Sequence, residues 1–496
     1  MNQFGNNVKK VMIVVLFLFI ALISYIAYFQ AFKAPDLAKD TNNKRVAAEK
    51  NNILRGTIYD RNMSPLTSGE KTGALTQSRN YIGGDVYVHA LGYVSQTYGT
   101  TALEKLYNEE LTTYTPTKED KKNSLFYNFS FEKLKTEFKN RGKEDDEIKK
   151  VGNGVVTTLN PTIQQAAYDA LGSNKGAAVA LNPKTGEVLA MVSKPTYDPN
   201  NLEAAISAAN SGGASNSPLI NRATNGLYPP GSTFKVVTTT SALENIPDVL
   251  SRTFDDSNGY IQISDKYSLS NDSGEANGYV DLKSAFLASS NVVFGGILAR
   301  ELGSETLKET AEKFGFNNDV PKEGFGLAQS KFPLETYPGV IAQSGIGQGG
   351  VLATPMQMAL VAATIANDGV MMEPKLVNSV VDSQQNVVKE IKSKEYKKVL
   401  SEEHAAVITD FMKSYVDSRV YGSWSFFEGT DACAKTGTAT VLDENGNKAE
   451  PHGWFIAFAP ADDPQIAVAV IVENAGYGGQ VAAPVAAAMI NAALGR

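Results

Sequence analysis

The sequence predicts an α+β protein in which an antiparallel sheet, covered by helices, follows a small N-terminal domain and one membrane-spanning helix. Three observations predict it. Residues 176–193 and 453–474 each show two apolar strands joined by turn residues. Residues 11–30 carry no charge and match the ~20 residues that a helix needs to cross a bilayer. The length of 496 residues exceeds that of one ordinary domain.

Composition disfavours several classes of function. The net charge of −7 provides no basic surface to collect phosphates, so we expect no nucleic-acid partner. The single cysteine, Cys433, rules out an intramolecular disulfide and a cysteine-based metal cluster. Only three histidines occur, widely spaced, which disfavours a zinc site and a Ser-His-Asp triad. We therefore expect chemistry without a metal or a cofactor.

The N-terminal segment predicts the compartment. Two lysines precede the apolar run, and Tyr25 and Tyr28 lie near its end, as aromatic residues do at a membrane interface. The run is longer than the apolar region of a signal peptide, so we expect an uncleaved anchor; a cleaved signal peptide would give the same compartment. More than 450 residues follow without a second long apolar run, so they must lie on one side. We expect residues 1–10 in the cytoplasm and the folded domains outside the cell.

The segment from residue 31 to residue 150 predicts a small non-catalytic domain that acts as a pedestal. Residues 31–50 are polar and charged, as in a tether. Residues 100–111 have the spacing of one helix. Its apolar face would hold Leu103, Leu106 and Leu111. No catalytic cluster occurs in this segment.

Residues 151–496 form the larger predicted domain. Its elements are a strand and a helix over 155–171, the hairpin 176–193, a strand over 434–440, the hairpin 453–474 and a helix over 481–495. Asn160 and Pro161 mark the start of the first helix. The strand before the second hairpin alternates small and polar side chains, and we expect it at an edge of the sheet.

The tripeptide Lys-Thr-Gly occurs three times, and only one copy lies where it can bind a substrate. The copy at 71–73 lies in a Ser/Gly-rich stretch that predicts a loop. The copy at 184–186 lies in the turn of the first hairpin, where glycine supplies a permissive backbone. The copy at 435–437 lies on the strand beside the second hairpin. An edge strand in that position can accept an extended peptide as an additional strand.

Ser232 and Lys235 form a second polar motif, in the first turn of a helix that follows Pro-Pro-Gly. Positions i and i+3 share a face of a helix, so the serine hydroxyl and the lysine amine can meet. Serine needs an adjacent base to act as a nucleophile, and burial lowers the pKa of lysine toward the neutral form that can be this base. The helix N-terminus favours negative charge that develops near the serine.

A third motif interrupts an apolar stretch with Ser289, Ser290 and Asn291. Buried polar side chains need partners. Asn291 can bind a substrate amide and hold the lysine, and Ser289 can relay a proton to a leaving amine. Each of these motifs also occurs in polar surroundings elsewhere: Ser-x-x-Lys at 68–71 and 130–133, and Ser-x-Asn at 78–80. Specificity therefore rests on the combination.

The order Ser-x-x-Lys, Ser-x-Asn, Lys-Thr-Gly is that of class A β-lactamases and penicillin-binding proteins, which have Ser-Asp-Asn in the middle. Here Ser290 replaces the aspartate, and no glutamate motif for a deacylating water is evident between Ser289 and Lys435. Both departures point away from a class A β-lactamase. The Gly-Ile-Gly-Gln-Gly run at 345–349 lacks the preceding strand and βαβ context of a phosphate-binding loop.

On these residues the chain resembles the class B penicillin-binding proteins, of the penicillin-binding protein A type, over nearly its whole length. The resembling segments are RGTIYDRN (55–62), GYVSQTYGTTALEKLYNEEL (92–111), PLINRATNGLYPPGSTFK (218–235), SGIGQGGVLATPMQMA (344–359), AKTGTA (434–439) and GWFIAFAP (453–460). The resemblance implies a serine β-lactamase-like transpeptidase domain on a pedestal. It also implies a single-pass cell-membrane protein whose extracellular domain cross-links peptidoglycan and binds β-lactams covalently.

By the same resemblance, Ser232 attacks the carbonyl of the penultimate D-alanine of a peptidoglycan stem peptide. D-Alanine leaves, and an acyl-enzyme remains for an amine of a neighbouring stem. Lys235 is the expected base, while Ser289 and Asn291 shuttle protons and orient the reactants. A separate glycan polymerase is the implied partner, and no cofactor is implied.

The third Lys-Thr-Gly copy supplies the implied substrate-binding residues. Lys435, Thr436 and Thr438 hold the terminal carboxylate, as a cation with nearby hydroxyls can. The backbone N–H groups of Ser232 and Thr438 form the oxyanion hole. Gly437 keeps the strand flush against the substrate.

Two other interpretations stay open. A D,D-carboxypeptidase or a β-lactam-hydrolysing enzyme would share the first half-reaction and use water as acceptor. A non-catalytic β-lactam sensor or scaffold would not need turnover. The pedestal and the anchor favour the transpeptidase, because they set the site at a height above the membrane, and the short inner tail argues against a sensor.

Five other residues receive structural interpretations. Cys433 is expected to be a small packed thiol on the same face of its strand as Lys435. His452 is expected in a loop. Trp424 and the two phenylalanines after it fit either a lipid-facing or lid-facing cluster or the core.

Overall fold

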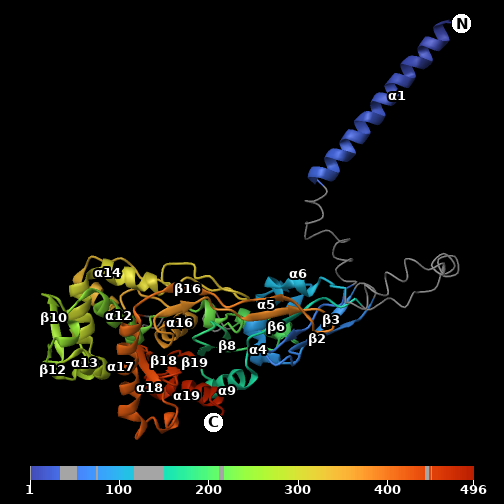
Figure 1. Cartoon of the computed structure of the whole chain (residues 1–496). Helices are drawn as coiled ribbons and strands as arrows, with labels where there is room; N and C mark the ends of the chain where they lie inside the picture. The colour runs from blue at the N-terminus through green and yellow to red at the C-terminus, as the bar shows by residue number, and fades with distance from the viewer. Residues whose placement is uncertain are drawn as a thin grey trace.

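The computed structural model describes residues 2–33, 53–73, 76–116, 150–211, 217–441, 446–447 and 449–496 (Figure 1). Helix α1 (Asn2–Tyr28) continues into the π-helical turn η1 (Phe29–Lys33). Its part Asn7–Lys33 is long and apolar enough to cross a membrane, and none of it is buried in the protein. This helix contains the span predicted over 11–30. The tether predicted after it lies almost wholly outside the described residues.

Short elements build the N-terminal part up to residue 116. They are β2 (Thr67–Lys71), β3 (Gln77–Tyr81), α4 (Gly84–Leu91), β4 (Val94–Ser95), β5 (Gly99–Thr100), α5 (Ala102–Leu106) and α6 (Asn108–Leu111). The loop prediction for the first Lys-Thr-Gly copy is wrong at Lys71, which ends β2 and pairs with Gln77 of β3. Residues 67–71 form a strand through backbone pairing with β3, although their sequence lacks the alternating apolar side chains that predict a strand.

The helix predicted over 100–111 is two short helices. Tyr107 separates them with φ −106° and ψ 23°, outside the usual helical range. Leu103 and Leu111 are buried as expected, but Leu106 is 53% exposed. The break changes the direction of the chain, so the three leucines do not share one continuous face.

A four-stranded sheet joins the N-terminal part to the larger part. Its order is β1 (Ile58–Tyr59), β6 (Gly154–Thr157), β14 (Val377–Val381) and β15 (Val387–Glu390). β1 runs parallel to β6, and the other pairs are antiparallel. Backbone hydrogen bonds therefore bridge segments that lie far apart in the chain.

The central sheet has five antiparallel strands, as the hairpin patterns predict. Its order is β17 (Cys433–Ala439), β18 (His452–Ala459), β19 (Ile466–Val472), β7 (Gly176–Leu181) and β8 (Val188–Lys194). The turn between β7 and β8 contains Gly186 at φ +72°, so the second Lys-Thr-Gly copy lies in a turn. β17, with the third copy, is an edge strand.

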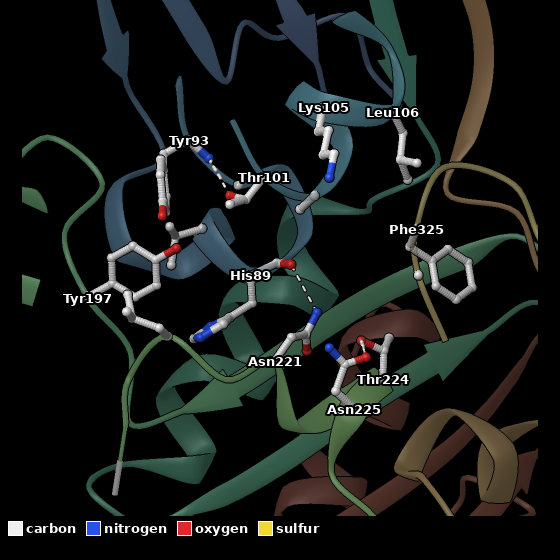
Figure 2. Close-up of a pocket in the computed structure, with 15 residues that line it drawn as sticks. His89, Tyr93, Thr101, Lys105, Leu106, Tyr197, Asn221, Thr224, Asn225 and Phe325 are labelled. Atoms are coloured by element: carbon white, nitrogen blue, oxygen red, sulfur yellow. Dashed lines mark hydrogen bonds between the residues drawn. The ribbon is translucent and has the colours of Figure 1, made fainter. Parts of the chain in front are cut away.

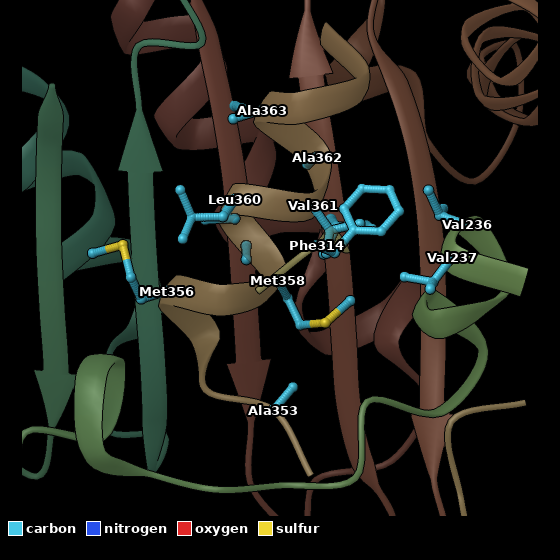
Figure 3. Close-up of a cluster of buried hydrophobic side chains, with 14 of the residues drawn as sticks. Val236, Val237, Phe314, Ala353, Met356, Met358, Leu360, Val361, Ala362 and Ala363 are labelled. Carbon is cyan, nitrogen blue, oxygen red and sulfur yellow. The ribbon is translucent and has the colours of Figure 1, made fainter. Parts of the chain in front are cut away.

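Helices cover both faces of this sheet. α12 (Lys235–Asn245) and α16 (Pro355–Ala366) pack on one face, where Figure 3 shows α16 crossing the strands beside Val236 and Val237. α9 (Pro161–Leu171) and α19 (Ala483–Ala493) pack on the other. The strands are apolar on both sides because both sides are buried. The predicted α+β fold class, with an antiparallel sheet between helices, is confirmed.

η3 (Gly231–Phe234) and α17 (Glu402–Val420) pack against β17. α13 (Leu282–Ala288) and η6 (Val292–Ala299) flank residues 289–291, and β9 (Phe254–Asp256) and η5 (Asp272–Gly274) precede them in the chain. The other described elements are α10 (Leu202–Ser211), α11 (Arg222–Asn225), η4 (Val249–Ser251), β10 (Tyr260–Ser264), β11 (Tyr267–Ser270), β12 (Gly278–Val280), α14 (Arg300–Lys313), α15 (Pro338–Ser344), β13 (Val370–Met372), β16 (Glu395–Lys398), η7 (Ser425–Phe427) and α18 (Gly478–Val481).

Candidate active site

Ser232 lies on η3, a tight turn pressed against the edge strand β17. Gly231 precedes it with φ +56°, and a Cβ at that position would lie 2.8 Å from Thr438 O. On its other side, Gly231 N donates to Gly347 O at 3.0 Å, so the Gly-Ile-Gly-Gln-Gly run packs against this turn. The positive φ and the close contact both require glycine. Ser232 is thereby held half-buried beside β17.

Gly437 is the matching small residue on the strand. A Cβ at this position would lie 2.7 Å from Pro230 O and 3.0 Å from Thr233 Cγ2. Any side chain would push β17 away from the turn that carries Ser232. The contact that requires glycine here is therefore with the protein's own chain.

Lys235 begins α12 and is fully buried. Its Nζ donates to Ser289 O at 2.5 Å, to Ser289 Oγ at 3.1 Å and to Asn291 Oδ1 at 2.8 Å. The hydrogen bond to Ser232 that the i, i+3 spacing suggests is not among these three. Burial lowers the pKa of Lys235 to about 7, although the charges of Asp272 and Asp256 oppose the shift. Near pH 7 much of this amine is therefore neutral, with a lone pair that can accept a proton.

Ser289 joins two lysines that are far apart in the sequence. It ends α13 in the left-handed region, at φ 55° and ψ 39°, which residues other than glycine seldom adopt. Its Oγ accepts hydrogen bonds from Lys235 Nζ at 3.1 Å and from Lys435 Nζ at 2.9 Å. One hydroxyl thus connects α12 to β17, in a position to pass a proton between them.

Lys435 lies on β17 with its side chain fully buried. Its Nζ also donates to Thr436 O at 3.3 Å and lies 4.6 Å from the centre of the Tyr415 ring. Burial, followed by the charges of Lys235 and Arg419, lowers the pKa of Lys435 well below its ordinary value. Among the described residues no carboxylate forms an ion pair with either lysine. A bound anion would supply the missing negative charge and raise both pKa values.

The free edge of β17 presents backbone groups to Ser232. Thr438 O points toward Gly231, and the N–H and C=O of one strand residue point to the same side. The Thr438 N–H therefore also faces the Ser232 turn. The side chains of Thr436 and Thr438 are half-buried and, because side chains alternate along a strand, they lie on the face opposite Lys435. Thr436 Oγ1 is 2.5 Å from Tyr415 OH.

Sequence reasoning missed four polar residues around these motifs: Asp256, Asn271, Tyr415 and Arg419. Ser290 does not face the cleft, because its Oγ donates to Asp256 Oδ2 at 2.7 Å. The Arg419 guanidinium stacks 3.8 Å from the centre of the Tyr415 ring and donates to Leu287 O at 3.2 Å. The i, i+4 spacing of Tyr415 and Arg419 on α17 is the one sequence signal that could have paired them.

The five residues given structural interpretations lie in packed surroundings. Cys433 is buried, and its Sγ lies 3.6 Å from Thr409 O. Trp424 belongs to the core, where its ring packs edge-on against Phe455. The loop expected for His452 is wrong, because this residue begins β18 and its ring contacts Tyr228.

A separate cavity of about 410 Å³ lies between the N-terminal part and the larger part (Figure 2). Several of its polar groups already have partners within the protein. His89 Nε2 lies 2.8 Å from Pro218 O, Asn221 Nδ2 donates to His89 O, and Thr101 Oγ1 accepts from Tyr93 N. This cavity contains none of the motif residues.

Two buried lysines on one serine hydroxyl, beside a second serine on a tight turn, are an arrangement that suits a serine acyltransferase. Residues 176–491 match the family described as the penicillin-binding protein transpeptidase domain, and residues 55–131 match the penicillin-binding protein A dimerisation domain. The chain belongs to the penicillin-binding protein transpeptidases, as its motifs predict.

Known proteins are similar to this chain in sequence and in structure over nearly its whole length. The peptidoglycan D,D-transpeptidase PbpA of Mycolicibacterium smegmatis is 34% identical, with 99% of both chains covered. PbpA of Mycobacterium tuberculosis is 32% identical, over 98% of this chain and 99% of that protein. The structure of penicillin-binding protein A from M. tuberculosis as a ceftriaxone acyl-enzyme complex has a TM-score of 0.76 at 32% identity, covering 90% of this chain and 100% of that one.

Proposed function

We propose that this chain is a serine-type peptidoglycan D,D-transpeptidase, inhibited covalently by β-lactams. One observation carries the proposal: Lys235 and Lys435, from different elements, both contact the Ser289 hydroxyl beside the turn that holds Ser232. Stem peptides ending in D-alanyl-D-alanine are the proposed donors. Family membership and the similar D,D-transpeptidases support this substrate.

In the first half-reaction, Ser232 Oγ forms a bond to the carbonyl carbon of the penultimate D-alanine. Its proton passes to neutral Lys235, either directly or through Ser289. The tetrahedral intermediate then collapses, the bond to the terminal D-alanine nitrogen breaks, and a proton returned through Ser289 makes that nitrogen an amine. Asn291 keeps Lys235 in place through the 2.8 Å contact.

The β17 edge is the proposed seat of the donor peptide. The N–H groups of Ser232 and Thr438 stabilise the oxyanion, and a donor lying along β17 adds a strand to the sheet. We assign the terminal carboxylate to Lys435 and to the Thr436 and Thr438 hydroxyls, which lie on the opposite face of β17 and reach the carboxylate around the free edge of the strand. Gly437 allows the strand and the Ser232 turn to approach closely enough for this arrangement.

The second half-reaction distinguishes the remaining interpretations. An amine of a neighbouring stem attacks the acyl-enzyme in a transpeptidase, whereas water attacks it in a carboxypeptidase or a β-lactam-hydrolysing enzyme. The lifetime of the labelled penicilloyl-enzyme distinguishes a β-lactamase from a transpeptidase. A β-lactamase would hydrolyse the acyl-enzyme and release the labelled product within seconds. A scaffold would form no functional acyl-enzyme, and a strain carrying only Ser232→Ala would then remain viable.

Labelled penicillin should form one covalent adduct, on Ser232. Intact-protein and peptide mass spectrometry checks this on the full-length chain in detergent and on a chain lacking residues 1–30. Both should react, since we assign the N-terminal helix to localisation alone. An adduct on Ser289, or none with any β-lactam, would show that the assignment of the nucleophile is wrong.

The three Lys-Thr-Gly copies should respond differently to substitution. Lys435→Ala removes a cation that a carboxylate needs, and a charged hydrogen bond is worth roughly 1.5–3 kcal/mol, so acylation should slow about ten- to a hundredfold or more. Lys184 is 56% exposed and pairs with Asp463, and Lys184→Ala should leave the rate unchanged. Lys71→Ala is a second control. Second-order acylation by a fluorescent penicillin measures all three. Equal acylation rates for Lys184→Ala and Lys435→Ala would show that the strand that binds the substrate lies in another part of the chain.

The location proposed for this enzyme is the cell membrane, with residues 1–10 cytoplasmic and the rest beyond the helix extracellular. The apolar helix Asn7–Lys33 supports it. We assign 31–150 to a non-catalytic pedestal and 151–496 to the transpeptidase domain. A separate glycan polymerase, supplying the strands to be cross-linked, is the proposed partner.

A further inference from the structure

Asp256 is a buried carboxylate behind the candidate active site. It ends β9 and is 1% exposed. Asn271 Nδ2 donates to both of its oxygens at 2.9 Å, Asn277 Nδ2 donates at 2.6 Å and Ser290 Oγ donates at 2.7 Å. Within the described part of the chain, Lys and Arg side chains form no ion pair with it. Burying a charge without an ion pair costs free energy, so the Asp256 carboxylate should have a role that offsets this cost.

Asp256 fixes the orientation of Asn271. Because the Asn271 amide nitrogen faces the carboxylate, its Oδ1 is turned toward the start of η6. There it accepts from Asn291 N at 2.8 Å and from Val292 N at 3.1 Å. A rotated amide would instead aim its nitrogen at these two donors. The carboxylate, together with Glu275 O, which accepts from the same nitrogen at 2.7 Å, therefore sets which atom of Asn271 meets the backbone beside Asn291.

Among the described residues, the segment held in this way contains every hydrogen-bond acceptor of Lys235. Ser290 is tied to Asp256 by its hydroxyl, and Asn291 N is tied to Asn271. The residues on either side of Ser290, Ser289 and Asn291, point the other way, toward Lys235. Their three oxygens accept from Lys235 Nζ. A shift of this short segment would displace the amine from Ser232.

We infer that Asp256 is a positioning residue for the acylation step: through Ser290 and Asn271 it holds Ser289 and Asn291 against Lys235. The inference rests on the proposed function. It explains why serine can stand in the middle of the Ser-x-Asn motif, since the negative charge is supplied from β9 instead. It also predicts that the charge of Asp256, in addition to its shape, acts on the base.

The charged groups facing Lys235 come from three elements. Asp256 on β9 and Asp272 on η5 favour its protonated form. Lys435 on β17 is a second amine at the same serine hydroxyl, and the charge of Lys235 lowers its pKa, so the two lysines repel each other when both are protonated. Removing the charge of Asp256 should therefore lower the pKa of Lys235 further. The rise of acylation rate with pH, which follows deprotonation of Lys235, should move to lower pH.

The experiment compares Asp256→Asn with Asp255→Asn in the full-length enzyme. Asp255 is the neighbouring residue on β9, but it is exposed and bonds only to Ser257 among the described residues. The second-order rate of acylation by a fluorescent penicillin is measured across pH, together with the melting temperature. We expect Asp256→Asn to shift the midpoint to lower pH and to reduce the plateau rate by about ten- to a hundredfold, because a small misplacement of a catalytic group has effects of this size. Asp255→Asn should change neither.

Ser290→Ala completes the test. It removes one contact to Asp256 and keeps the charge, so the plateau rate should fall by up to about tenfold while the midpoint stays near that of the wild type. An Asp256→Asn enzyme with the wild-type midpoint and plateau would overturn the inference. If Asp256→Asn does not fold, Ser290→Ala with a wild-type plateau would overturn it. Failure of the proposed function itself would appear separately, as a wild-type enzyme that penicillin does not acylate on Ser232.

Discussion

Lys235→Met is expected to slow the acylation of Ser232 by about 10²–10⁴-fold, the usual contribution of a positioned general base. Methionine has a similar length and fills the buried space, but it has no lone pair of sufficient basicity. In the wild type the amine is charged below its pKa of about 7 and can act as a base only above it. The wild-type rate should therefore rise with pH through about 7 and then level off, and the variant should lose this rise.

A fluorescent penicillin measures this rate on both sides of pH 7. Lys283→Met is the matched control, because Lys283 lies on the nearby α13 but is only half-buried and pairs with Asp410 at 2.7 Å. Its acylation should equal that of the wild type. A Lys235→Met enzyme that is acylated at the wild-type rate, with the same pH profile, would remove Lys235 from the role of base.

Thr438→Pro is expected to slow acylation by about 10²–10³-fold, the value of one oxyanion-hole donor. Proline lacks the N–H that faces the Ser232 turn. Because this N–H points to the free edge of β17, its loss leaves the ladder to β18 intact, and proline is tolerated on edge strands in that orientation. The melting temperature should therefore change little while the rate falls.

Thr438→Ala separates the backbone donor from the hydroxyl. It keeps the N–H and removes only the side-chain contact to the carboxylate, so its rate should fall by no more than about tenfold. Both variants are measured with the same penicillin after their melting transitions have been compared. Equal losses in the two would mean that the Thr438 N–H does not stabilise the oxyanion.

Local patterns predicted much of this fold correctly. The two apolar hairpins, the Asn160-Pro161 helix start and the edge strand with Lys-Thr-Gly follow from periodicity and turn chemistry, which act over a few residues. The errors occur where such signals are weak. Lys71 lies in a strand whose residues, TSGEK, show no apolar alternation, and the break at Tyr107 interrupts an otherwise helical pattern.

The sequence by itself determined which residues are candidates for the chemistry and their order along the chain, because each motif spans only three or four consecutive residues. Only the tertiary structure decided what they touch. Ser289 lies 54 residues from Lys235 and 146 from Lys435, and its hydroxyl contacts both because α13 meets α12 and β17. Lys235 turns toward Ser289 and Asn291, and Ser290 toward Asp256, because buried polar groups take the partners that packing brings within reach. No spacing rule contains that information.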